Sequence, residues 1–291
     1  MVRFSPTEAV FAGFRFVKER PATMLVWAAY LLVLLVVTTV AMVDIGGDSL
    51  TSLAIAFQGA NPDPAQLSKL AEQLAPASLF GQLMITVFGS VLATAILRVR
   101  LSPGSHAWGG LRLGGDELRM LGATLLVMVC VAFVSLVAQT LADFVAPAAV
   151  QMGILGLGLL VTLALQVRLS LVGVVSQAEG RISLPRSFHL TRGLFWRLVG
   201  AFVLLGAITL VILFLLAVIF AALMGAAAVA LGGGVNQMAL ALEGRFGDLN
   251  PLLAGLYVLF DLAMVWVMVV FLAVFLSIAA EAYKSGLLER R

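Results

Sequence analysis

Four arginines lie close together in one short stretch of the chain and could bind phosphate. They are Arg181, Arg186, Arg192 and Arg197, and aromatic residues such as Trp196 are interleaved with them. A guanidinium group makes bidentate hydrogen bonds to phosphate oxygens, and a basic residue near an anionic leaflet contributes about 1 kcal/mol to binding. The stretch therefore predicts a site for lipid headgroups. The alternative is that these residues only anchor a helix at the membrane surface and set its orientation.

A second set of polar residues lies within apolar runs. Asp261 is an acid in such a run, and ionisable groups inside membranes often act as proton relays or ion ligands. Arg168 could extend its side chain to the interface, and Gln166 and Gln139 could form hydrogen bonds between helices. These four residues are candidates for an intramembrane polar site, and simple helix packing is the alternative.

No motif for catalysis or metal binding occurs in the sequence. The two histidines, His106 and His189, are not part of an H-E-x-x-H pattern, and Cys130 is the single cysteine. Neither a G-x-x-x-x-G-K-[ST] phosphate loop nor a G-x-S-x-G elbow is present. We therefore predict no enzymatic activity, no cofactor and no metal. The net charge of +3 is spread over short loops and does not indicate a nucleic-acid partner.

Six apolar runs must position these residues. The chain is 62% hydrophobic and only 11% charged, which excludes an ordinary soluble domain. About 20 helical residues cross a bilayer core of about 30 Å. The runs long enough to do so are Ala22–Val43, Leu79–Leu97, Met120–Ala142, Val150–Gly173, Leu198–Ala230 and a stretch within Leu252–Ala280. The predicted fold class is an all-α integral membrane protein with six transmembrane helices in a single membrane domain, residues 1–291.

The basic residues predict the orientation of these helices. All but two of the 18 Lys and Arg residues fall in segments on one side of the membrane, and the exceptions are Lys69 and Arg245. Short loops rich in Lys and Arg remain in the cytoplasm. We therefore expect both termini in the cytoplasm. On the outer side, Pro64–Leu74 has helical spacing and Gly232–Gly234 indicates a helix stop.

Three inner segments share a design. They open with Ser5-Pro6, Ser102-Pro103 and Ser183-Leu184-Pro185, and each continues with apolar and basic residues in the pattern of a helix lying in the interface. Each is followed by a long apolar hairpin. The sequence thus predicts three repeats of an interfacial amphipathic helix plus a transmembrane hairpin, at about 4–97, 101–178 and 182–286. The alternative is the loose periodicity of any six-span protein with basic inner loops.

The stretch Arg181–Arg197, RISLPRSFHLTRGLFWR, carries a family resemblance. It is similar to a Ser-aromatic-x-Leu-Thr-Arg-Gly-x-Phe-Trp-Arg run in bacterial inner-membrane proteins of the glycerophosphodiester phosphodiesterase membrane-domain-like family. The phosphodiesterase activity in that name belongs to a separate soluble domain, which we do not expect in this chain. The resemblance implies a bacterial inner-membrane protein with the six-span plan and a connection to lipids, without catalysis.

The predicted function is a non-enzymatic membrane protein that binds or organises phospholipids as a homo-oligomer. The length of Leu198–Ala230 favours this function, because one helix of that length is about 50 Å long and exceeds the bilayer core. Lipid or another copy of the chain could cover the excess. One alternative is a transporter or permease subunit that uses Asp261. Another is a scaffold for assembling an envelope complex.

Overall fold

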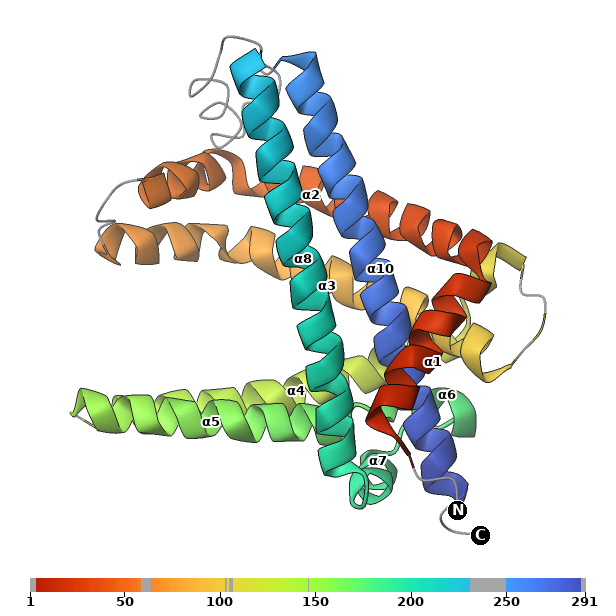
Figure 1. Ribbon diagram of the computed structural model, residues 1–291. Helices are drawn as coiled ribbons and strands as arrows, with labels where there is room; N and C mark the ends of the chain where they lie inside the picture. The colour runs from red at the N-terminus through yellow and green to blue at the C-terminus, as the bar shows by residue number, and fades with distance from the viewer. Residues whose placement is uncertain are drawn as a thin grey trace. The chain divides into compact units, whose positions relative to one another are not determined.

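The computed structural model describes residues 4–58, 64–102, 104, 107–145, 147–230 and 250–288, which form helices and no strand (Figure 1). The elements, in chain order, are α1 (Pro6–Glu19), α2 (Pro21–Gln58), α3 (Pro64–Leu101), the 3₁₀ turn η1 (Ala107–Gly110), α4 (Gly115–Asp143), α5 (Ala148–Leu169), α6 (Val172–Glu179), α7 (Leu184–Thr191), α8 (Phe195–Ala230) and α10 (Pro251–Leu288). The predicted stop at Gly232–Gly234 lies outside the described residues, as do His106, Pro103 and Arg245.

Six of these helices are long and apolar enough to cross a membrane, which confirms the predicted fold class. Their candidate spans are Pro21–Gly47, Leu67–Leu101, Trp108–Asp143, Ala148–Glu179, Phe195–Ala227 and Pro251–Gly286. Helices suit this environment because each satisfies its own backbone hydrogen bonds, which lipid cannot do. The protein is therefore an all-α, multi-pass membrane protein.

Contacts within the predicted membrane domain group into two compact units. The first comprises Met1–Val26, Thr86–Gly206 and Val270–Arg291. The second comprises Trp27–Ile85 and Ala207–Val269. The first unit contains the arginine-rich stretch, and the second contains Asp261.

Close helix packing forms the core of the first unit. A side chain at Gly13 of α1 would place its Cβ 2.8 Å from Val274 Cγ1, so α1 lies directly against α10. Val10 of α1 is fully buried, whereas Phe11 remains 58% exposed. Helix α1 begins as predicted, with Ser5 at the N-cap and Pro6 at the first helical position.

Helices α4 and α5 form an antiparallel hairpin in the same unit (Figure 1). Near its base, Ala123, Leu169 and Val172 form a small buried cluster, and Cys130 packs against that cluster. Cys130 thus packs there as a small hydrophobic residue. Farther along the hairpin, many large apolar side chains of α4 and α5 are exposed, as expected where lipid replaces water.

In the second unit, helical structure extends beyond the predicted spans. Helix α2 continues to Gln58 with a break at Gly47, where φ is +47°. Helix α3 starts at Pro64, which confirms the helix predicted at Pro64–Leu74. The connection between the first two predicted spans is therefore helical over its described residues 44–58 and 64–78. Phe220 of α8 stacks on Phe260 of α10 at 4.2 Å between ring centroids.

The inner segments differ from their predicted form in two places. In the described part of the second segment, the backbone forms only the turn Ala107–Gly110, where φ is positive at Trp108, Gly109 and Gly110. Glycine-rich sequence disfavours a helix there. In the third segment, α7 ends at Thr191 and α8 begins at Phe195. Trp196 and Arg197 therefore belong to the first turn of a membrane span rather than to an interfacial helix. The threefold repeat remains a prediction.

Candidate anion-binding site

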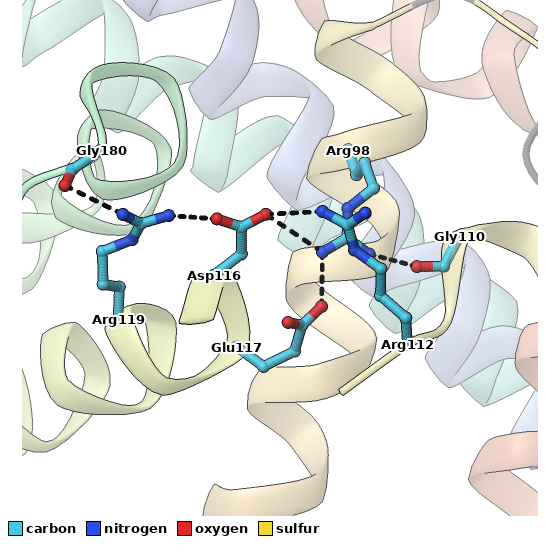
Figure 2. Close-up of polar contacts among 7 residues, drawn as sticks. All are labelled: Arg98, Gly110, Arg112, Asp116, Glu117, Arg119 and Gly180. Atoms are coloured by element: carbon cyan, nitrogen blue, oxygen red, sulfur yellow. Dashed lines mark hydrogen bonds and ion pairs between the residues drawn. The ribbon is translucent and has the colours of Figure 1, made fainter. Parts of the chain in front are cut away.

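The first of two charged clusters in the first unit is a network of ion pairs around the start of α4 (Figure 2). Asp116 accepts hydrogen bonds from Arg98, Arg112 and Arg119, at 3.4 Å from Arg98 and 2.9 Å from Arg112. Glu117 lies 2.5 Å from Arg98. The side chains of Arg98 and Glu117 are only 10% and 5% exposed, so their charges compensate each other away from solvent.

Local structure explains why this network forms. Asp116 and Glu117 occupy the first turn of α4, where the helix dipole favours acidic residues. Arg98 comes from the last turn of α3 and also donates to the carbonyl of Gly110. Arg119 donates at 3.2 Å to the carbonyl of Gly180, which follows α6. The network thus joins the ends of α3, α4 and α6, and its arginines are already occupied.

Two of the predicted lipid-binding arginines belong to a second charged cluster, around Glu179. Glu179 accepts from Arg186 at 3.1 Å and from Arg181 at 3.3 Å. The hydroxyl of Tyr283 lies 3.4 Å from the same carboxylate. Arg181 and Arg186 are therefore engaged in ion pairs with an acid that the sequence analysis did not select. The signal was present, because Glu179 is the acidic residue nearest to both arginines in the chain.

Two further arginines that the sequence analysis selected, Arg168 and Arg192, line a hollow between the end of α5 and α7. The hollow has a volume of about 460 Å³, and its lining residues are Arg168, Pro185, Phe188, His189 and Arg192. None of them is acidic. Among the described residues, no carboxylate forms an ion pair with Arg168 or Arg192. The hollow is thus a positively charged cavity without a matching negative charge.

Aromatic rings hold the Arg168 side chain in this hollow. Its guanidinium carbon lies 5.2 Å from the ring centroid of Phe195 and 6.0 Å from that of Phe188. Cation–π contacts of this kind fix the plane of a guanidinium group without using its hydrogen-bond donors. The donors of Arg168 therefore remain available to an anion.

Hydroxyl groups fix α7 against the end of α5. The fully buried Ser187 donates at 2.6 Å to the carbonyl of Arg168, one of the carbonyls that a helix end leaves without a partner. Ser183 caps α7 by accepting from the backbone N–H of Arg186. Thr191 donates back to the carbonyl of Ser187 at 2.9 Å. These bonds set the spacing between Arg168 and Arg192.

The structure therefore groups the site residues differently from the two predicted sets. Arg192 from the arginine stretch and Arg168 from the intramembrane set share one hollow. Arg197 is not among the residues that line it. Trp196, at the start of α8, is 80% exposed and packs edge-on against Phe195, which makes it a candidate contact for lipid or an interface rather than a wall of the hollow.

The other members of the intramembrane set do not join this site. Gln139 and Gln166 are exposed on α4 and α5, and neither forms a hydrogen bond to another side chain within the described residues. Asp261 is exposed on α10 between the exposed Leu259 and Leu262. The side chains of Gln139, Gln166 and Asp261 therefore face outward on the single chain.

The described residues contain no group of three or more His, Cys, Asp or Glu side chains that could hold a metal ion. The chemistry that the hollow offers is anion binding. Two guanidinium groups can form bidentate hydrogen bonds to one phosphate, and the adjacent apolar spans place this phosphate at the end of a membrane-crossing hairpin.

Comparison of the chain with protein-family models, curated proteins and solved structures finds no match. The resemblance of Arg181–Arg197 to the membrane-domain-like family thus remains a prediction. The class that the structure supports is a multi-pass, all-α membrane protein with a basic hollow at the end of one hairpin.

Proposed function

We propose that this protein is a non-enzymatic integral membrane protein that binds the headgroups of anionic phospholipids in the hollow between Arg168 and Arg192. The observation that carries the proposal is the difference in charge balance among the basic residues of this unit. Arg98, Arg112, Arg119, Arg181 and Arg186 all pair with acids. Arg168 and Arg192 line a cavity whose walls contain no acid.

The energetic reason is that an unmatched positive cavity favours an anion. A phosphate in the hollow would receive charge-assisted hydrogen bonds, which contribute about 1.5–3 kcal/mol each. Phospholipids are the abundant source of phosphate at the end of a membrane span.

The orientation belongs to the same proposal. The hollow lies beside the arginine-rich inner segments, so the positive-inside rule favours the cytoplasmic leaflet and cytoplasmic termini. The family resemblance of Arg181–Arg197 supports a bacterial inner membrane as the location. Cysteines at the exposed positions Glu72 and Lys284, each in a Cys130→Ala background, test this orientation. A membrane-impermeant maleimide should label only the Glu72→Cys protein in intact spheroplasts. Labelling of the Lys284→Cys protein from outside would contradict the orientation.

The proposal includes a homo-oligomer. Helix α8 has 36 residues and is thus about 54 Å long, well over the thickness of a bilayer core. Its exposed apolar side chains, such as Leu210, Phe214 and Val218, extend along much of this length. Packing against other copies of the chain would cover apolar surface that protrudes from the bilayer.

The experiment that tests headgroup binding compares single arginine variants. Arg192→Gln and Arg168→Gln should each reduce the phosphatidylglycerol bound to the purified protein by about tenfold, equivalent to about 1.4 kcal/mol. Arg181→Gln is the matched control, because it removes the same charge from a residue that already pairs with Glu179. Native mass spectrometry reports bound lipid and oligomer size together. Equal lipid binding by all three variants would reject the hollow as the site, and a monomeric wild type would reject the oligomer.

A further inference from the structure

A second hollow lies on the same hairpin, farther from the charged end. It has a volume of about 300 Å³ and is formed between α4 and α5. Phe133 and Val137 contribute from α4, and Leu157, Gly158 and Val161 contribute from α5. The lining is entirely apolar. In a polar hollow water would be the natural occupant, but an apolar one favours a hydrocarbon group.

Small residues shape this second hollow. A Cβ atom on Gly158 would lie 2.5 Å from the Cβ of Ala138, so the two helix backbones approach closely at that point. The larger side chains of Phe133 and Leu157 also line the hollow. Small residues thus bring the two helices close together, and larger apolar side chains complete the lining of the hollow.

The two hollows share one face of α5. Val161 and Leu157 precede Arg168 by about two and about three helical turns, so all three side chains project from the same side of the helix. The distance along the helix from Arg168 to Leu157 is about 16 Å. One stripe of α5 therefore begins at the basic hollow and continues into the apolar one.

We propose that a single phospholipid occupies both hollows, with its phosphate at Arg168 and Arg192 and one acyl chain lying along α5 in the hollow beside Leu157. This inference rests on the proposed headgroup site and extends it to the whole lipid. The surrounding lipid is as apolar as the hollow, so an acyl chain that enters the hollow does not leave water. Its binding energy comes from contact with fixed protein atoms instead. The protein should thus discriminate moderately between acyl chains and strongly between headgroups.

A matched pair of variants separates the two hollows. Leu157→Trp fills the apolar hollow, whereas Leu159→Trp makes the same change two residues away on the opposite face of α5. The two leucines are similarly exposed, at 64% and 60%, and only Leu157 lines the hollow. Both substitutions therefore place a large aromatic side chain on a lipid-facing position.

The experiment titrates the purified protein with long-chain and with short-chain phosphatidylglycerol and measures both affinities by native mass spectrometry. The wild type should prefer the long-chain lipid by about fivefold, a ratio within the range of packing contributions between membrane helices. Leu157→Trp should bring this ratio close to one and leave the affinity for the short-chain lipid unchanged. Leu159→Trp should keep the wild-type ratio.

The outcomes that overturn this inference differ from those that overturn the headgroup site. A wild-type ratio of one, or equal effects of the two Trp variants, would reject the acyl-chain hollow while Arg192→Gln still lowers both affinities. If Arg192→Gln leaves both affinities unchanged, the headgroup site fails and the inference fails with it. Inorganic phosphate competing fully with the long-chain lipid at equal concentration would also contradict it.

Discussion

The ion-pair network around Asp116 and the hollow between Arg168 and Arg192 use the same residue type for opposite purposes. In the network, each arginine meets a carboxylate, and Arg98 and Glu117 are nearly buried together. In the hollow, two arginines line an open cavity with no carboxylate on its walls. Removing an arginine of the network should therefore destabilise the fold. Removing an arginine of the hollow should instead weaken ligand binding.

The difference shows that the number of arginines in a segment does not predict which of them bind lipid. Arg181 and Arg186 are closer in sequence to Arg192 than Arg168 is, yet Glu179 occupies both. Arg168 comes from a different helix and faces the hollow because Ser187 fixes α7 against the end of α5. Availability of the guanidinium donors is the property that separates a ligand site from a structural pair.

The largest expected effect is the loss of stability when Arg98 is replaced. Arg98→Gln leaves Glu117 buried without its partner and should lower the free energy of unfolding by about 3 kcal/mol. Arg112→Gln removes a pair whose arginine is 62% exposed and should cost less than about 1 kcal/mol. Thermal unfolding in detergent measures both. The double variant Arg98→Gln/Glu117→Gln should recover most of the loss, since it removes the unpaired charge; equal losses for the two single variants would contradict the comparison.

A smaller effect is expected when the charge in the hollow is kept and its geometry is changed. Arg192→Lys should bind phosphatidylglycerol about threefold more weakly than the wild type, because an ammonium group lacks the bidentate fork. Arg181→Lys should bind as the wild type does. Neither variant should change the melting temperature noticeably. If Arg192→Lys binds lipid as well as the wild type, the hollow acts only as diffuse positive charge.

The smallest expected effect concerns the second unit. Asp261 is exposed on α10, so Asp261→Asn should change the free energy of unfolding by less than about 0.5 kcal/mol and leave lipid binding unaltered. Melting and lipid titration in the same detergent measure both quantities. A loss of lipid binding would show that the site is not confined to the first unit. A large change in stability would indicate that Asp261 contacts another copy of the chain, and would revive its predicted role as an intramembrane site.

Much of the fold could be predicted from the sequence because membrane insertion depends on local composition. A run such as Ala22–Val43 is apolar along its whole length, and no distant residue is needed to make it a span. The helix start at Ser5-Pro6 was also predictable, because the preference for Ser at the N-cap and Pro at the first helical position is local to the sequence. The inner segments were less predictable, because a single turn at Ala107–Gly110 and a full interfacial helix have similar patterns of apolar and basic residues.

The candidate site could be predicted only in part. The sequence analysis selected the arginine stretch as basic and interleaved with aromatic residues, and one of its members, Arg192, lines the hollow. Arg168 was assigned to another set because it lies at the end of a different span. The pairing of Arg181 and Arg186 with Glu179 depends on the turn between α6 and α7, where Gly180 takes a φ of +68°. Glu179 is the acid nearest to both arginines in the sequence, but only this turn shows that its carboxylate reaches the two guanidinium groups.

The sequence by itself determined the class of the protein: six apolar helices, all-α, with basic residues concentrated in particular loops. These properties follow from the cost of placing charge and unpaired backbone groups in hydrocarbon, which is decided residue by residue along the chain. Only the tertiary structure decided which charges neutralise one another. Arg100 pairs with Glu281 at 2.8 Å, although 181 residues separate the two in the sequence. Electrostatic interaction depends on distance in space, so it is the packing of helix ends that leaves Arg168 and Arg192 without an ion-pairing carboxylate among the described residues.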